Sequence, residues 1–181
     1  PLPLGRALDI AYQIARGLEA AHAAGVVHRD VKPGNVMLTG TAVKVLDFGL
    51  VQTRGPDSSA ALTQTSLTAQ KLIGTPAYMP PEIILGRADV DRRADVYAIG
   101  CVAFYLLTGT RVFQDGNQMQ MLVDHIHAEA VPPSARLGTP LAREVDQFVL
   151  DCLRKNPDDR PKDAGELLER IHAYNLAGRW S

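Results

Sequence analysis

Long apolar runs, a secretory signal and paired cysteines are all missing from this sequence. No stretch reaches the roughly 18 consecutive apolar residues that a membrane-spanning helix needs, and the N-terminus lacks a signal-peptide pattern. The two cysteines, Cys101 and Cys152, form no paired motif, which is typical of proteins from a reducing compartment. These absences predict a cytoplasmic location and no membrane contact from this segment.

A strong charge of either sign is also missing. The formal net charge is −1, so nothing in the composition indicates nucleic acid or an anionic membrane as a general partner. The 181 residues are 46% apolar and 22% charged. That composition is sufficient to bury one core and indicates one domain or less.

Histidine and cysteine residues do not occur at metal-binding spacing. No second His or Cys lies at ligand spacing from His28, and His125 and His127 are two residues apart, on different faces of a predicted helix. We therefore expect His28 to pack beneath Phe48. Three other histidines are expected to be polar surface residues: His22, His125 and His127.

What the sequence does contain is a dense polar loop followed by a second acid. Asp30 lies in His-Arg-Asp-Val-Lys-Pro-Gly-Asn at residues 28–35, and Asp-Phe-Gly follows at residues 47–49. Few chemistries need an acid, a lysine and an asparagine in one loop with a second acid ahead of a Phe-Gly turn. Phosphoryl transfer from a nucleotide is the leading one, because its catalysis is mostly positioning and charge neutralisation.

Each polar residue of this pattern has a chemical use. Mg²⁺ prefers hard oxygen ligands and keeps several waters, so the side-chain oxygens of Asn35 and Asp47 suffice beside the phosphates. Asp30 can face the attacking hydroxyl and accept its proton. Lys32 can share a face with Asp30 in an extended stretch and place positive charge on the transferred phosphate. Pro33 stiffens the loop that holds them.

Short β-prone runs at residues 36–38 and 43–46, joined by a hairpin-like turn, put both acids at strand-loop junctions. Two other interpretations stay open. One is a polar surface turn, because three-residue matches often arise by chance. The other is an unrelated metal-dependent hydrolase that uses Asp30 and Asp47, which would leave residues 74–82, Asp95 and Arg160 unexplained.

In these motifs and their order, the chain resembles the eukaryotic-type (Hanks-type) serine/threonine protein kinases, and specifically the C-terminal lobe of their catalytic domain. The resemblance runs from about Leu4 to about Tyr174. It implies ATP and Mg²⁺ as cofactors, Asp30 as the catalytic base, and Asn35 and Asp47 as the metal ligands.

Lys32 marks the serine/threonine class of this family, since the tyrosine-specific branch usually carries an Ala-Ala-Arg type sequence at this point. The resemblance implies catalytic roles for Lys32, Asn35 and Asp47 beside the base. It also implies that these three residues and Met37 contact the nucleotide. The expected substrates are proteins with Ser or Thr acceptor hydroxyls.

The activation segment of the family corresponds to residues 47–82. It closes in Gly-Thr-Pro-Ala-Tyr-Met-Pro-Pro-Glu at residues 74–82, where Pro80 replaces the Ala of the family's Ala-Pro-Glu. Thr75 corresponds to the catalytic-site hydroxyl that hydrogen-bonds the catalytic acid and helps to select Ser or Thr acceptors. A threonine that caps a turn is the structural alternative for Thr75.

The middle of this segment is rich in hydroxyl side chains. A phosphate on one of them would add close to two negative charges, which Arg29, beside the catalytic acid, is positioned to pair with. The family's usual interval before Gly74 predicts Thr68, then Ser66, as the phosphorylated residue. The alternative is an unmodified flexible loop.

The rest of the sequence predicts a scaffold of helices. Small and apolar residues recur at helical steps from Ala7 to Ala21, in a helix expected to stop at Gly25. Residues 95–109 are apolar nearly all round, which predicts an enclosed helix with Asp95 as its N-cap. Further helices are expected near residues 117–128, 141–153 and 162–174.

In the family, residues 95–109 correspond to the central helix. The resemblance implies that Asp95 is tied to the backbone of the catalytic loop and that Arg160 pairs with Glu82. The predicted fold class is mainly α (α+β): a kinase-like C-lobe in which a helical bundle surrounds a buried central helix, with a small β-hairpin near the catalytic loop.

The family's Gly-rich loop, its Val-Ala-Ile-Lys strand and the helix with the partner Glu have no counterpart in the sequence. We therefore expect residues 1–178 to be the C-lobe alone, a fragment of a longer reading frame whose N-lobe is a missing partner. Apolar surface should be exposed where that lobe would pack. The fragment alone is predicted to be inactive, and a non-catalytic substrate-binding or scaffolding module is the alternative function.

Overall fold

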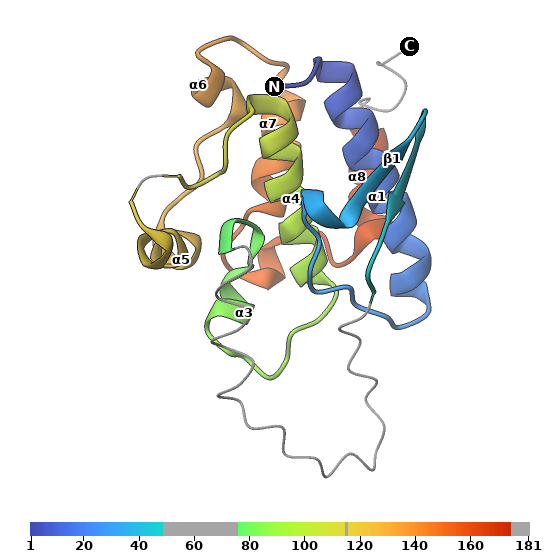
Figure 1. The fold of residues 1–181 in the computed structure, drawn as a ribbon, viewed down its shortest axis with the longest axis vertical. Helices are drawn as coiled ribbons and strands as arrows, with labels where there is room; N and C mark the ends of the chain where they lie inside the picture. Colours follow the sequence, from blue (N-terminus) through green and yellow to red (C-terminus); the bar gives the residue numbers. More distant parts are fainter. Residues whose placement is uncertain (49–75, 115, 175–181) are drawn as a thin grey trace.

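The computed structural model describes residues 1–48, 76–114 and 116–174. Helices dominate these residues, with one two-stranded sheet at the edge (Figure 1). The elements are α1 (Leu4–Ala23), η1 (Pro33–Asn35), β1 (Val36–Thr39), β2 (Ala42–Val45), η2 (Pro76–Tyr78), α3 (Pro81–Ile84), α4 (Arg93–Thr108), α5 (Gln118–His127), α6 (Pro133–Leu137), α7 (Arg143–Cys152), η3 (Pro157–Asp159) and α8 (Ala164–Ala173), where η marks a 3₁₀ turn.

Helix α4 runs through the middle of the molecule (Figure 1) and is buried on nearly every side. Tyr97, Ile99 and Phe104 are completely enclosed, as a helix that is apolar all round requires. Helices α1, α6, α7 and α8 pack against it. A β-carbon on Gly100 would lie 2.6 Å from Cβ of Cys152, so glycine allows α4 and α7 to approach closely. The predicted central helix is confirmed.

The prediction that Asp95 caps this helix is wrong. The helix starts at Arg93, and Asp95 lies inside its first turn. Asp91, two residues before the start, accepts a hydrogen bond from the Arg93 N–H at 2.9 Å. Because Asp91 already satisfies that N–H, the carboxylate of Asp95 is available to other parts of the chain.

Helix α1 places its apolar stripe on the core, and it ends just before Gly25, whose φ of 76° suits a glycine. The strands β1 and β2 pair antiparallel, from Val36 opposite Val45 to Thr39 opposite Ala42. The Gln13 side chain of α1 accepts a hydrogen bond from Val43 N. The hairpin is therefore anchored on α1, and its two open ends meet at the polar loop.

The predicted helices near residues 117–128, 141–153 and 162–174 are confirmed as α5, α7 and α8. The short helices α3 and α6 were not predicted. Each has its first residue at a proline and spans only four or five residues, too few to show a helical period. No helix in the described parts of the chain combines the length and the apolarity needed to cross a bilayer.

Two of the three histidines expected at the surface are buried. His22 is 3% exposed and His125 is fully enclosed, whereas His127 is exposed as predicted. The Tyr97 hydroxyl and Nδ1 of His125 are 2.8 Å apart, and the Phe113 ring lies edge-on to the imidazole. Both buried histidines continue the apolar stripe of their helix, and that is the sequence signal that would have identified them.

The predicted pairing of Glu82 with Arg160 is confirmed. The Arg160 guanidinium donates to both carboxylate oxygens of Glu82, at 2.7 and 2.9 Å, and both side chains are nearly inaccessible to solvent. Arg160 also donates to the carbonyl oxygens of Arg93, Arg154 and Lys155. One guanidinium therefore joins α3, the first turn of α4 and the loop before η3.

We expect Glu82→Gln to lower the free energy of unfolding by about 3–5 kcal/mol, because it leaves the Arg160 charge buried without its partner. Urea unfolding followed by circular dichroism measures this loss. Asp158→Asn is the matched control. It removes an ion pair with Arg93 in which Asp158 is 78% exposed, so it should cost no more than about 1 kcal/mol. Equal losses in the two variants would contradict the assignment.

His125 should make the fold sensitive to acid. Burial, and secondarily the nearby Lys155 ammonium, lowers the pKa of His125 from 6.5 to about 4. The unfolded chain then binds more protons than the folded one between pH 6.5 and 4, so the free energy of unfolding falls as the pH falls through this window, by up to about 3 kcal/mol. His125→Gln should flatten this slope in urea titrations, whereas His127→Gln, on the exposed side of α5, should leave it unchanged.

Candidate active site

The polar loop between α1 and β1 is held from below by the carboxylate of Asp95. Oδ2 of Asp95 accepts a hydrogen bond from the His28 N–H at 2.8 Å, and Oδ1 accepts one from the Arg29 N–H at 2.7 Å. Asp95 is completely buried. The predicted tie between the central helix and the polar loop is therefore present, and it fixes the two residues that precede Asp30.

His22 completes this anchor. It lies 2.9 Å from Oδ2 of Asp95 through Nε2, and its Nδ1 accepts a hydrogen bond from the Ala164 N–H at 3.1 Å. Because Nδ1 accepts, the neutral ring carries its proton on Nε2 and donates it to Asp95. The N-terminus of α8 is thus linked through one imidazole to the polar loop, a role of His22 that was not predicted from the sequence.

His28 joins the two acids of the site. Its Nε2 donates to the Leu46 carbonyl oxygen at 2.8 Å, and its Nδ1 accepts the Asp30 N–H at 3.2 Å. Because a carbonyl oxygen only accepts, this fixes the tautomer with the proton on Nε2. The Phe48 ring lies edge-on at 4.7 Å between centroids, so the predicted packing is confirmed. One buried ring therefore fixes the backbone of Asp30 relative to Leu46, the residue before Asp47.

Asp30, Lys32 and Asn35 converge. Nζ of Lys32 lies 2.8 Å from Oδ2 of Asp30. Nδ2 of Asn35 donates to the same oxygen at 3.0 Å and to the Asp30 carbonyl at 2.9 Å. The extended backbone at Lys32 and the 3₁₀ turn that follows bring these side chains together. Both donors meet Oδ2, so Oδ1 of Asp30 accepts no hydrogen bond from the described residues.

Asp47 follows directly from the end of the hairpin. The Leu46 N–H donates to the Asn35 carbonyl at 2.8 Å, which places Asp47 one residue beyond a direct link to the polar loop. Asp47 has φ 59° and Arg29 has φ 65°, a region that non-glycine residues seldom occupy. Such conformations cost about 1–3 kcal/mol each, and here the bonds from Asp95 and His28 hold the chain in them.

The donor set fits Mg²⁺. The amide nitrogen of Asn35 is occupied by Asp30, which leaves its hard oxygen Oδ1 for a cation, and Asp47 accepts no hydrogen bond from the described residues. No group of three or more His, Cys, Asp or Glu side chains within residues 1–48, 76–114 and 116–174 is arranged to hold a metal. Two protein oxygens that depend on phosphates and waters for the remaining ligands are what Mg²⁺ accepts.

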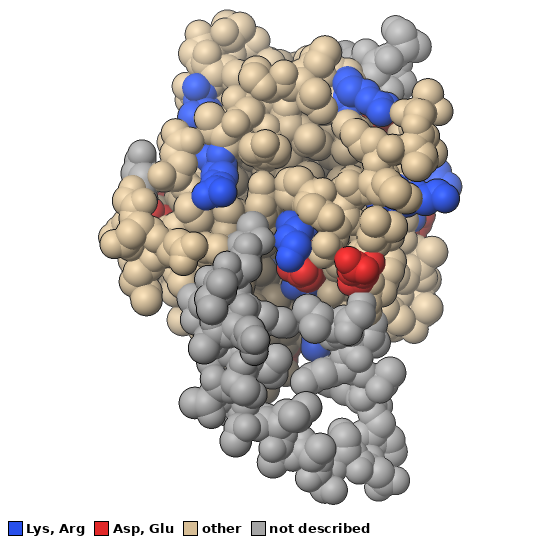
Figure 2. Space-filling view, viewed as in Figure 1, with Lys and Arg blue, Asp and Glu red and all other residues tan. Residues whose placement is uncertain are grey.

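Apolar and charged surface adjoin at this site. Met37, on β1, is 40% exposed, and Leu38 and Leu46 are 50% and 36% exposed. The face seen in Figure 1 carries scattered Lys and Arg side chains and one central place where acidic and basic groups adjoin (Figure 2).

Nε of Arg29 is buried and forms no hydrogen bond with the described residues. Five residues named in the sequence analysis lie outside the described residues: Gly49, Ser66, Thr68, Gly74 and Thr75.

Comparison with known proteins agrees with this geometry. Residues 2–172 match the family described as the protein kinase domain, so the chain belongs to the protein kinase domain family. The mostly helical fold with one small sheet is compatible with that family.

Individual relatives are more specific. The chain is 38% identical over 176 residues to the serine/threonine-protein kinase PknB of Mycobacterium tuberculosis and 37% identical over 177 residues to that of Mycobacterium leprae, which covers 95% and 96% of the chain and 27% of each relative. It is 40% identical over 165 residues to a probable PknB of Corynebacterium glutamicum, over 89% of the chain and 25% of that protein. The chain thus spans about a quarter of the length of these relatives.

Asp95→Asn should loosen the catalytic loop. The amide replaces one acceptor oxygen with a donor that faces N–H groups, so we expect a loss of about 1.5–3 kcal/mol in the free energy of unfolding. Amide hydrogen exchange at His28 and Arg29 should accelerate in parallel. Asp146→Asn, which replaces one of the two carboxylate oxygens that accept hydrogen bonds from Ser134, should leave that exchange unchanged. Unaltered protection of residues 28 and 29 in Asp95→Asn would rule out the anchor.

Proposed function

We propose that this chain is the C-terminal lobe of a serine/threonine protein kinase, which transfers the γ-phosphate of ATP to Ser or Thr hydroxyls of proteins. The observation that carries the proposal is the convergence of Lys32 and Asn35 on one oxygen of Asp30, next to the strand end that delivers Asp47. A polar surface turn has no need for such an arrangement. The serine/threonine kinases among the relatives support the same activity.

Asp30 acts as the base in this proposal. Lys32 and Asn35 both hold Oδ2, so Oδ1 is the oxygen free to accept the proton of the acceptor hydroxyl. The hydrogen bond from Asn35 to the Asp30 carbonyl oxygen fixes the backbone that carries this carboxylate. Lys32, 25% exposed, can also turn its ammonium towards the transferred phosphate without leaving the site.

Asn35 and Asp47 would hold Mg²⁺, which supplies neutralisation of the negative charge on the phosphate oxygens. The exposed side chain of Met37 offers apolar surface to the base of ATP. The remaining work of the chain is orientation. His28 bonds the backbone of Asp30 and the carbonyl of Leu46, the residue before Asp47. It thereby fixes the separation of the two acids, so that both carboxylates can act at a single phosphate.

Residues 47–82 form the activation segment in this proposal. Thr75 would hydrogen-bond the catalytic acid and favour Ser or Thr acceptors, as the kinase family implies. A phosphate on Thr68, or on Ser66, would meet Arg29, whose Nε is already buried beside the site without a partner in the described residues. This would convert a charge on the segment into a fixed position for the acceptor.

We assign residues 1–178 to the C-lobe, with the nucleotide enclosed by an N-lobe elsewhere in a longer protein. The exposed apolar side chains of Met37, Leu38 and Leu46 are suited to pack against it. A cytoplasmic location fits because the cytoplasm supplies ATP and keeps the free thiols of Cys101 and Cys152 reduced.

In a protein that joins this chain to an N-lobe, Asp30→Asn should lower kcat by about 10²–10⁴ with little change in KM for ATP, because only proton acceptance is removed. Asp47→Asn should abolish the Mg²⁺ dependence of nucleotide binding. Transfer of ³²P to a Ser/Thr peptide and titration with ATP measure these effects. Glu144→Gln, on the exposed side of α7, is the neutral control.

The same assay tests the alternative of a non-catalytic binding module. Wild-type protein that binds substrate peptides but transfers no phosphate, or Asp30→Asn protein with unchanged turnover, would favour the binding module. The present chain without an N-lobe should show no measurable transfer, since it supplies no lysine for the α- and β-phosphates.

A further inference from the structure

A concave site lies away from the polar loop. A groove of about 350 Å³ is formed by the end of α3, the end of α5 and the loop between α7 and η3. Leu85, Ile126 and Pro157 supply apolar wall, and Leu85 is 52% exposed. The volume is at the small end of ligand sites, which suits one or two side chains of a peptide. The proposed phosphoryl transfer makes no use of this surface.

The groove is preformed, because its three walls are tied together beneath it. Arg160 bonds the carboxylate of Glu82 on α3 and the carbonyl of Lys155 in the loop. Nζ of Lys155 donates to the carbonyl oxygens of Asp124 and His125 in the last turn of α5, at 3.2 and 2.9 Å. A segment that binds here meets a surface that needs no rearrangement, which reduces the entropic cost of association.

The groove carries an excess of positive charge. Among the described residues, Arg87 and Lys155 line it with basic groups, and the one acidic lining residue is Glu82. Glu82 is 4% exposed, and both of its oxygens are taken by Arg160. Arg87 is exposed and forms no ion pair with the described residues. A bound segment with a carboxylate would therefore meet, at the end of the apolar wall, a guanidinium that is not paired with any described residue.

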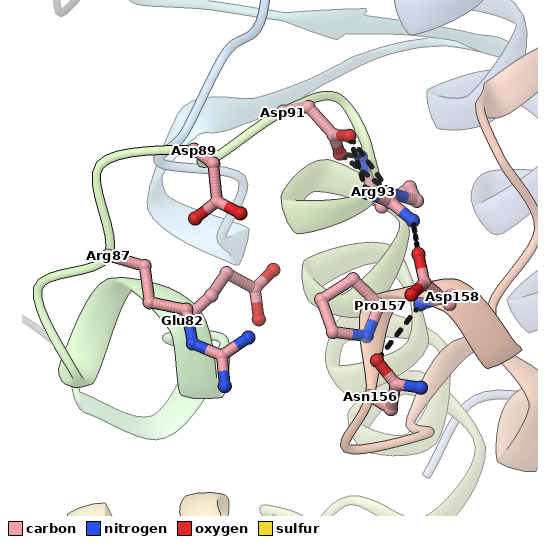
Figure 3. Close-up of a pocket in the computed structure, with 8 residues that line it drawn as sticks. All are labelled: Glu82, Arg87, Asp89, Asp91, Arg93, Asn156, Pro157 and Asp158. Carbon is pink, nitrogen blue, oxygen red and sulfur yellow. Dashed lines mark hydrogen bonds and ion pairs between the residues drawn. The ribbon is translucent and has the colours of Figure 1, made fainter.

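A smaller pocket, which shares Glu82, Arg87, Asn156 and Pro157 with the groove, has more acidic than basic lining residues (Figure 3). It is lined by Asp89, Asp91 and Asp158, but its volume of about 60 Å³ accommodates water rather than a side chain. Arg93 forms ion pairs with both Asp91 and Asp158. The acidic pocket is therefore too small to bind a basic side chain, and the larger groove determines which charge the bound segment carries.

We propose that this groove binds an extended segment of protein substrates in which a large apolar side chain, seated against Leu85 and Ile126, stands next to an acidic side chain that pairs with Arg87. Its purpose rests on the proposed kinase function. Helix α3 begins three residues after η2 and contains Glu82, the last residue of the proposed activation segment. A substrate held here keeps its acceptor hydroxyl at high effective concentration near that segment.

The direct test is peptide binding in the absence of nucleotide. The probe is a fluorescein-labelled peptide of Gly and Ser with one Phe followed by two Asp, titrated with the purified protein and followed by fluorescence anisotropy. We expect a dissociation constant of about 0.1 mM, as befits a small interface. Replacement of the Phe by Gly, or of both Asp by Lys, should weaken binding at least about tenfold.

Two variants assign the site. Arg87→Glu should weaken binding of the Asp peptide about tenfold and make the Lys peptide the tighter ligand, and Leu85→Ser should weaken both peptides. Arg143→Glu reverses an exposed charge at the start of α7 outside the groove and should bind like the wild type. The inversion of preference cannot come from misfolding.

Three results would overturn the proposal: Arg87→Glu and Arg143→Glu with the same affinities, a Gly-substituted peptide that binds as well as the Phe peptide, or no binding at millimolar protein. Sedimentation velocity supplies a fourth. A dimer of the wild type that Leu85→Ser abolishes would assign the groove to a second copy of the chain instead. Because no step involves ATP, failure here leaves the assignment of phosphoryl transfer to Asp30 untouched.

Discussion

The buried carboxylate of Asp95 is the interaction on which the site depends. It accepts hydrogen bonds from His22 and from the backbone N–H groups of His28 and Arg29, on a helix that is enclosed by the rest of the protein. A carboxylate without water is costly unless donors replace its hydration. Folding therefore cannot bury Asp95 without also fixing the loop, and the geometry of Asp30 is coupled to the stability of the core.

The first turn of α4 serves both halves of the site. Its Arg93 carbonyl accepts a bond from Arg160, which holds Glu82 and so the segment after η2, while Asp95 two residues later holds the catalytic loop. The segment after η2, which would receive the acceptor, and the polar loop, which would perform the transfer, are thus both held by one turn of one buried helix. This explains why an otherwise apolar core tolerates a buried ion pair and a buried acid close together.

The sequence predicted the elements whose signal is local or repeated. Helix α4 was evident from its continuous apolarity, the hairpin from two β-prone runs, and the Glu82–Arg160 pair from resemblance to the kinase family. The start of α4 was misplaced because Asp91 and Asp95 are equally plausible caps by residue type. The burial of His22 and His125 could have been predicted from the apolar stripe of their helices, but their partners Asp95 and Tyr97 could not, because these lie 73 and 28 residues away. Thr75 stays a prediction, since it lies outside the described residues.

The left-handed backbone at Arg29 and Asp47 has a consequence for protein engineering. Neither residue favours that conformation in a free peptide. The backbone geometry of the site is therefore imposed by the surrounding structure and not by the two motifs alone. Grafting residues 28–47 onto a foreign framework would transfer the polar side chains without the backbone conformation that brings them together. A transplant would need to carry the aspartate-bearing helix and the α1 histidine along with it.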